Sequence, residues 1–228
     1  MEKEFKHTNN STFKDLIVET REDGKRFYKT PSGISYPSVT TVTGFEKSKF
    51  FAKWRRENPE ESRRVLKRGN ELHQAIEDYI NNKLDESTLT PNTLHLFRQM
   101  KGLLHNIDNV SAQEVPLWSD ILKLAGRVDC VAEYNGELSI IDFKGSTREK
   151  LEKDIDNYFM QASAYAIMWQ ERTGTPIKNI VVLISCEDGA VQEFQRNPVN
   201  YCRPLYLCID KYNEHMKETN NVQYSQSQ

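Results

Sequence analysis

Apolar and polar residues alternate or cluster in short runs over the second half of the chain, which predicts a β-sheet core. The strands are predicted at residues 113–118, 124–134, 137–143, 179–185 and 190–195. Asn135 and Gly136 separate the second and third strands, and this pair favours a tight two-residue hairpin turn. Two shorter strands are predicted near the start of the chain, at 16–19 and 26–29.

Elsewhere the apolar positions follow a helical period. From Ser38, a candidate N-cap, to about residue 106 the pattern is helical, with a clear 3.6-residue stripe over 60–81. Further helices are predicted at about 155–172 and 203–217. The order of elements is a helical block, a three-stranded meander, a helix, a strand pair and a helix, which indicates an α/β fold.

The chain shows no internal repeat and no linker rich in Gly, Ser or Pro. We therefore expect one domain over residues 1–218, with a helical elaboration at about 38–108 and a core at about 111–218. Residues 219–228 are predicted to form a flexible polar tail.

Composition narrows the class of protein. The net charge of −2 and the 28% of charged residues argue against a protein that coats duplex DNA. No apolar run is long enough to cross a membrane, and the polar start resembles neither a secretory signal nor a mitochondrial transit peptide. We therefore expect a cytoplasmic protein without disulfides or membrane contact.

One segment is much more basic than the chain as a whole. Residues 46–68 contain nine Lys or Arg against four Glu, interleaved with Phe50, Phe51 and Trp54. One interpretation is a solvated helix face with three core aromatics. The other is a channel for a nucleic-acid strand, with phosphate contacts and stacking rings. In that case the candidate DNA-binding residues are Lys53, Trp54, Arg55, Arg56 and Arg68.

A pair of charged residues ends one of the buried strands. Asp142 and Lys144 lie two positions apart, so they share one face of the strand while Ile141 and Phe143 point to the opposite layer. A lone Asp-x-Lys is often a surface ion pair. However, pairing across the predicted hairpin turn brings Asp129 beside Asp142, and two adjacent carboxylates repel unless a cation lies between them. Oxygen ligands suit Mg²⁺ or Mn²⁺.

Two helical pairs could complete such a site. His73 and Glu77 are four residues apart on one helix, and Gln161 and Tyr165 are four apart on another. Each pair also has an ordinary explanation: a packed histidine, an exposed carboxylate, or a helix face that packs on the sheet.

Four motifs occur together in a set order: Gly-x-x-x-His at 69–73, Gly-x-x-Asp at 126–129, Asp-x-Lys at 142–144 and Gln-x-x-x-Tyr at 161–165. This combination resembles the RecB-like branch of the PD-(D/E)xK nuclease superfamily, most closely its exonucleases of phage and mitochondrial genome maintenance type. The resemblance implies a restriction-endonuclease-like core, with a mixed central β-sheet flanked by helices. It also implies that the N-terminal helical block forms an arch over the active site. Together with the missing transit peptide, the resemblance suggests that the protein belongs to a bacterium or a phage-infected cell.

The same resemblance implies a ligand set for a divalent metal, Mg²⁺ or Mn²⁺. His73, Asp129 and Asp142 would bind the metal, helped by the main-chain carbonyl of Phe143. Glu114 is a further candidate ligand, or supports the metal indirectly.

The remaining roles concern the water and the phosphate. Lys144 would act on the attacking water, and Gln161 and Tyr165 would support the site and the scissile phosphate. Ser38 could touch a phosphate along the substrate path.

The sequence departs from the family pattern after Lys144, where Gly145 replaces a common Thr; Ser146 is a candidate to supply a hydroxyl instead. Some relatives bind an iron–sulfur cluster through four cysteines, one of which precedes the core. Here the first cysteine is Cys130, so we expect no iron–sulfur cluster.

The expected function is a metal-dependent deoxyribonuclease, an exonuclease on single-stranded DNA ends in recombination, replication or repair. Two alternatives stay open: a structure-specific endonuclease of the same fold, and a catalytically inactive DNA-binding protein. A third reading takes the acidic residues as ordinary ion pairs.

Overall fold

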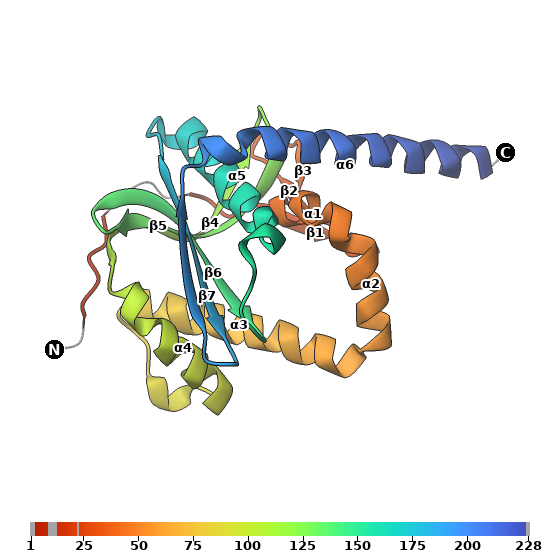
Figure 1. Ribbon diagram of the computed structural model, residues 1–228. Coiled ribbons are helices and arrows are strands. Elements are labelled where there is room, and N and C mark those ends of the chain that lie inside the picture. The colour runs from red at the N-terminus through yellow and green to blue at the C-terminus, as the bar shows by residue number, and fades with distance from the viewer. Residues whose placement is uncertain (1–2, 9–12, 22, 227–228) are drawn as a thin grey trace.

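The computed structural model describes residues 3–8, 13–21 and 23–226. Its centre is a five-stranded sheet whose strands lie in the order β4-β5-β6-β7-β8 (Figure 1). The β6 and β7 strands are parallel and the other neighbours are antiparallel, so the predicted mixed α/β core is confirmed. The strands are β4 (Ile107–Ser119), β5 (Leu124–Tyr134), β6 (Glu137–Ser146), β7 (Asn179–Cys186) and β8 (Val191–Arg196).

The β5–β6 hairpin forms at the predicted turn. Tyr134 pairs with Glu137, and the two residues between them have positive φ angles, 52° at Asn135 and 82° at Gly136. Asn and Gly tolerate this left-handed conformation better than other residues do. The turn therefore fixes a register in which Cys130 pairs with Ile141.

Helices cover both faces of the sheet, which makes three layers (Figure 1). On one face lie α3 (Pro59–Ile80) and α4 (Pro91–Leu104), and their buried residues share a cluster with Ile141 and Phe143 of β6. On the other face lie α1 (Val39–Thr43), α5 (Asp156–Thr173) and α6 (Val199–Gln226). Ile141 and Phe143 thus point to the layer opposite α5, as the strand period predicts.

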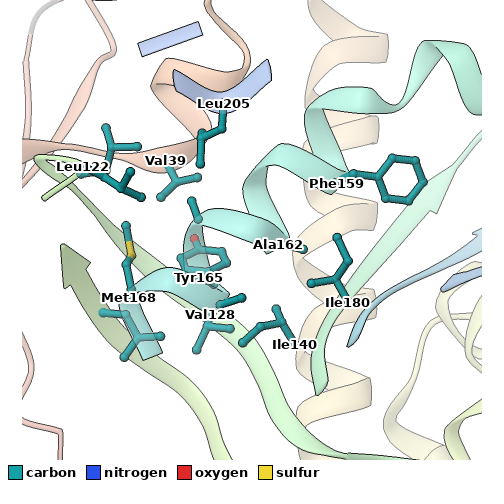
Figure 2. Packing of buried hydrophobic residues seen from close by; sticks show 14 of the residues in the cluster. Val39, Leu122, Val128, Ile140, Phe159, Ala162, Tyr165, Met168, Ile180 and Leu205 are labelled. Atoms are coloured by element: carbon teal, nitrogen blue, oxygen red, sulfur yellow. The ribbon is translucent and has the colours of Figure 1, made fainter. Parts of the chain in front are cut away.

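The α5 helix links β6 to the parallel strand β7 and packs closely on the sheet. Its buried face is rich in small residues, among them Ala162 and Ala164, which let the helix approach Val128 and Ile140 of the strands (Figure 2). Each large apolar side chain in this cluster, such as Phe159 at 0% exposure, contributes about 1.5–3 kcal/mol to folding.

Local signals account for where several helices begin and end. Ser38 is the N-cap of α1, and its Oγ accepts a hydrogen bond from the Thr41 N–H at 3.0 Å, as predicted. Thr90 caps α4 in the same way, directly before Pro91. Gly174 ends α5 in a left-handed conformation.

The structure corrects the prediction in three places. A short strand, β3 (Ser35–Pro37), was not predicted; it joins β1 (Ile17–Thr20) and β2 (Arg26–Lys29) in a separate antiparallel sheet. The helical block is broken by Asn58 and Pro59, so α2 (Ser48–Glu57) is a separate helix. Single turns of 3₁₀ helix lie at η1 (Phe45–Lys47), η2 (Glu86–Thr88) and η3 (Glu152–Asp154).

A further correction concerns the C-terminus. The last helix was predicted to end at Lys217, but α6 continues to Gln226 through most of the predicted tail. Residues 227–228 lie outside the described part of the chain. Over the residues that are described, none of the helices is long and apolar enough to cross a membrane.

Candidate active site

A cleft of about 580 Å³ opens between α3, the β4–β5–β6 edge of the large sheet and the start of α1. His73 of α3, Asp129 of β5 and Lys144 of β6 line it, together with Gln161 and Tyr165 of α5. Residues from all four sequence motifs therefore meet in one cleft, although they lie on four different elements.

Asp142 and Lys144 form a close ion pair at the end of β6. The Lys144 ammonium lies 2.6 Å from the carboxylate of Asp142, and Gln161 Nε2 donates a second hydrogen bond to Asp142 at 2.9 Å. Burial raises the pKa of Asp142, which is 2% exposed, and Lys144 offsets this only in part. Burial also lowers the pKa of Lys144, but the charges of Asp142 and Asp129 outweigh it and raise that pKa above the usual lysine value.

Asp129 is held from two sides. Its Oδ2 accepts the main-chain N–H of Phe143 at 2.9 Å and lies 3.6 Å from His73 Nδ1. The first contact crosses the β5–β6 hairpin and follows from its register. The predicted role of the Phe143 carbonyl stays a prediction, since the contact seen here is made by its nitrogen.

Glu114 of β4, a further candidate ligand from the sequence, lies close to His73 and Asp129. Three side chains each offer one ligand atom, and these atoms lie within 4.8 Å of one another: His73, Glu114 and Asp129. A metal ion can bridge atoms at this spacing. Glu114 also has a φ of +49°, a left-handed conformation that is rare in a strand and costs about 1–3 kcal/mol. Burial, then the charges of Asp129 and Glu77, raise the pKa of Glu114 to about 8.

This group fits a divalent cation by its chemistry. It combines an imidazole with two carboxylates, and burial, together with the charge of Asp129, raises the pKa of Glu114, which a bound cation would oppose. Among the described residues, Asp142 does not belong to the group of His73, Glu114 and Asp129. Its carboxylate instead accepts hydrogen bonds from Lys144 and Gln161. Its predicted role as a direct ligand stays a prediction.

Comparison with known proteins agrees with the motifs. The sequence profile described as "PD-(D/E)XK nuclease superfamily" matches residues 95–218, more than half of the chain. The chain belongs to the PD-(D/E)XK nuclease superfamily. The two relatives reported below carry an exonuclease name.

Mitochondrial genome maintenance exonuclease 1 of Mus musculus is 27% identical over 177 residues, covering 68% of this chain and 51% of the mouse protein. The Homo sapiens protein of the same name is 24% identical over 169 residues, covering 68% and 48%. This nuclease-family chain therefore spans about half the length of these relatives. A crystal structure named "Putative exonuclease" from Eubacterium rectale superposes with a TM-score of 0.42 at 12% identity, over 69% of this chain and 68% of that one.

Two nuclease motifs are in direct contact through Gly126 and Tyr165. A Cβ atom added to Gly126 would lie 2.6 Å from the Tyr165 hydroxyl oxygen. Tyr165 is 3% exposed, and burial raises the pKa of its hydroxyl well above the usual value. The glycine of the Gly-x-x-Asp motif is therefore required because the tyrosine of the Gln-x-x-x-Tyr motif packs against its backbone.

Arg68 lines the cleft but is 5% exposed, so it is not a free basic group. Its guanidinium donates to Thr147 Oγ1 at 3.1 Å and to the Gly145 carbonyl at 3.4 Å, and it lies 3.2 Å from Glu187. A Cβ on Gly145 would lie 3.2 Å from Leu72 Cδ2 of the same helix, so the glycine leaves room for α3. Arg68 therefore fixes α3, which carries His73, to the end of β6.

The two serines proposed from the sequence are both buried. Ser38 lies at the cleft wall, with its Oγ engaged by Thr41. Ser146 Oγ donates to the Arg148 carbonyl at 2.7 Å. The phosphate contact predicted for Ser38 and the hydroxyl contact predicted for Ser146 stay predictions.

The basic segment spans η1, α2 and the first part of α3, and α2 buries none of its residues. Phe50 is 67% and Phe51 is 44% exposed, and Trp54 is half-buried. The interpretation of these three rings as core aromatics is therefore wrong. In Figure 1, α2 stands apart from the sheet and connects α1 to α3.

Sequence reasoning missed three residues near the site. Arg26 and Arg127 line the cleft, and the Tyr158 ring lies 5.2 Å from the Lys144 ammonium in a cation–π contact. Tyr158 is three residues before Gln161, one helical turn away, so the helical period could have placed it near the site. Arg26 lies on another sheet and gave no such signal.

Proposed function

We propose that this nuclease is a divalent-metal-dependent deoxyribonuclease that degrades single-stranded DNA from its ends. The observation that supports this most directly is the meeting of Lys144 with the His73, Glu114 and Asp129 group in one cleft. A half-buried ammonium beside a set of metal ligands provides the groups that phosphodiester hydrolysis needs.

In this proposal His73, Glu114 and Asp129 would hold Mg²⁺ or Mn²⁺, with Asp142 on the adjacent strand. When bound, such an ion supplies positive charge to the phosphate and lowers the pKa of water. The protein holds the ligands ready beforehand: the Phe143 N–H fixes Asp129, and Gln161 fixes Asp142. These fixed hydrogen bonds reduce the reorganisation needed when substrate binds.

Lys144 then serves as a positioned cation. Its raised pKa means that it carries a proton at neutral pH, so it can stabilise the charge that develops on the phosphate and can donate a hydrogen bond to the attacking water. Asp142 orients the Lys144 ammonium by accepting its hydrogen bond, and the same ammonium lies 5.2 Å from the centroid of the Tyr158 ring. Tyr165 and Gln161 also line the cleft.

The preference for single strands is supported by α2. Exposed rings next to basic side chains bind unstacked bases and phosphates without regard to sequence. The α2 helix connects α1 to α3, and residues of both α1 and α3 line the cleft, so α2 is the segment that would make a strand enter by its end.

The test uses four substrates with Mg²⁺ or Mn²⁺: single-stranded DNA labelled at the 5′ end, the same strand labelled at the 3′ end, linear duplex, and a closed single-stranded circle. The proposal expects both labelled strands to be degraded while the circle stays intact, and the order of label release reports the polarity. The Lys144→Ala protein is the control and should be inactive on all four. Cutting of the circle would replace the exonuclease by an endonuclease, and failure to cut any substrate would indicate a DNA-binding protein.

A further inference from the structure

A second cavity lies at the base of α2, outside the candidate active site. It has a volume of about 470 Å³ and is enclosed by the β1–β2 turn, α1, η1, α2 and α6. Lys25, Lys49, Phe51, Arg55, Tyr212 and His215 are among its lining residues. Thr40 lines both this cavity and the catalytic cleft, so the two are neighbours.

Two of the cations that line the cavity have no partner among the described residues. Within the described ranges, neither Lys49 nor Arg55 makes a side-chain hydrogen bond or an ion pair. Lys25 differs, because its ammonium lies 2.7 Å from Asp23. Two unpaired cations on the wall of one cavity favour an anionic ligand.

Tyr212 of α6 gives independent evidence for a ligand. Its side chain is 3% exposed, and its hydroxyl has no hydrogen-bond partner in the described structure. A buried hydroxyl without a partner costs about 1–3 kcal/mol. Burial also raises its pKa, so the hydroxyl keeps its proton and can donate it to an acceptor.

Aromatic rings complete the wall. The His215 ring packs against Phe45 in a tilted arrangement, with centroids 4.9 Å apart, and Phe51 is 44% exposed. Rings, cations and a hydroxyl donor in one cavity match the parts of a nucleotide: a base and a phosphate.

We propose that this cavity binds one nucleotide of the DNA strand whose scissile bond lies in the neighbouring cleft. The phosphate lies between Lys49, Arg55 and the Tyr212 hydroxyl, and the base lies against Phe51. This proposal rests on the proposed function. The proposal also separates the basic residues of α2 that line this cavity from those that do not. Lys53 lines neither the cavity nor the cleft, and its ammonium lies 3.8 Å from the carboxylate of Glu57.

The matched pair Lys49→Gln and Lys53→Gln tests this division. Both lysines are exposed on α2, and both substitutions remove one positive charge. The measurement is fluorescence anisotropy of a labelled 12-nucleotide oligothymidylate with EDTA present, over a range of salt. We expect Lys49→Gln and Arg55→Gln each to weaken binding about tenfold and to reduce the salt slope by about 0.7. Lys53→Gln should change affinity less than twofold.

Tyr212→Phe removes only the hydroxyl. It should weaken strand binding about threefold or more while the melting temperature stays constant or rises, because the lost group has no partner within the protein. A purely structural role for the hydroxyl would instead lower the melting temperature.

Inorganic phosphate and thymidine monophosphate are separate probes of the same cavity. If Lys49 and Arg55 govern binding of these small anions but not of the strand, the cavity takes a free phosphate and our assignment is wrong. If all the variants bind strands like wild type while Lys144-dependent cleavage persists, the cavity proposal fails and the proposed function stands. If wild type neither binds nor cleaves DNA, both fail.

Discussion

Gly126→Ala tests the contact between two motifs of the site. The new Cβ would lie 2.6 Å from the Tyr165 hydroxyl oxygen, and 3.1 and 3.2 Å from two ring carbons. Ordinary contacts begin near 3.4 Å, so the tyrosine ring has to move by about 1 Å. Because Tyr165 is 3% exposed and packed in the core on the α5 side of the sheet, the ring cannot move freely (Figure 2).

We expect this overpacking to cost about 1–3 kcal/mol of unfolding free energy. For a chain of this length, that loss lowers the melting temperature by roughly 3–10 °C. Cleavage should fall further, by about a hundredfold, since a displacement of about 1 Å at a catalytic group has effects of that size. Calorimetry and single-turnover cleavage measure the two effects.

Two further variants make the test specific. Adding Tyr165→Phe removes the nearest clashing atom, so the double variant should recover part of the melting temperature lost in Gly126→Ala. Gly102→Ala is the matched control, because a Cβ at this exposed position of α4 meets nothing within 4 Å. It should stabilise the protein by about 0.5–1 kcal/mol. A Gly126→Ala protein with the stability and activity of wild type would refute the reasoning.

Three further predictions concern the cleft. Tyr158→Leu should slow cleavage about tenfold while Tyr158→Phe stays within twofold of wild type, because the ring and not the hydroxyl contacts Lys144; equal rates in the two variants would remove this role. Gly69→Ala places a Cβ in open space inside α3, so the melting temperature should rise while strand binding weakens at the cleft wall; unchanged binding would show that DNA does not approach there. Since the metal-free Glu114 has a pKa of about 8, protons compete with the metal below pH 8. Calorimetric Mg²⁺ or Mn²⁺ affinity should rise by up to tenfold per pH unit until pH 8 and then level off, and Glu114→Gln should flatten this rise; an equal slope in that variant would contradict Glu114 as a ligand.

The parts of the site that the sequence predicted depend on local rules. The Asn135-Gly136 turn fixes the β5–β6 register, and the register places Asp129 beside the strand end that carries Asp142. Strand alternation then orients Lys144 with Asp142. Each step spans a few residues, so a pattern in the sequence can report it.

Features that need distant contacts were not predictable in this way. Glu114 reaches the metal group through a left-handed backbone conformation inside a strand. The residues next to it in the sequence do not indicate this conformation. In the sequence, Arg68 lies in a basic segment and has no evident partner. In the structure it forms an ion pair with Glu187, which is distant in sequence. The cavity that joins Lys49 to Tyr212 forms only because α6 packs beside α1 and η1.

The end of α6 shows a different limit. Residues 219–226 are polar and without an apolar stripe, which is typical of a tail, but the helix already formed from Val199 continues through them. Elongating an existing helix is far easier than nucleating a new one, so composition alone misplaced its end.

The most direct test of the central claim is single-turnover cleavage of a 5′-labelled single-stranded DNA by wild type and Lys144→Ala, with Mg²⁺ or with EDTA. The account predicts cleavage by wild type that EDTA abolishes, together with no detectable cleavage by Lys144→Ala despite strand binding close to that of wild type. Cleavage by Lys144→Ala at the wild-type rate, or cleavage by wild type that persists in EDTA, would contradict the assignment of this cleft as a metal-dependent nuclease centre.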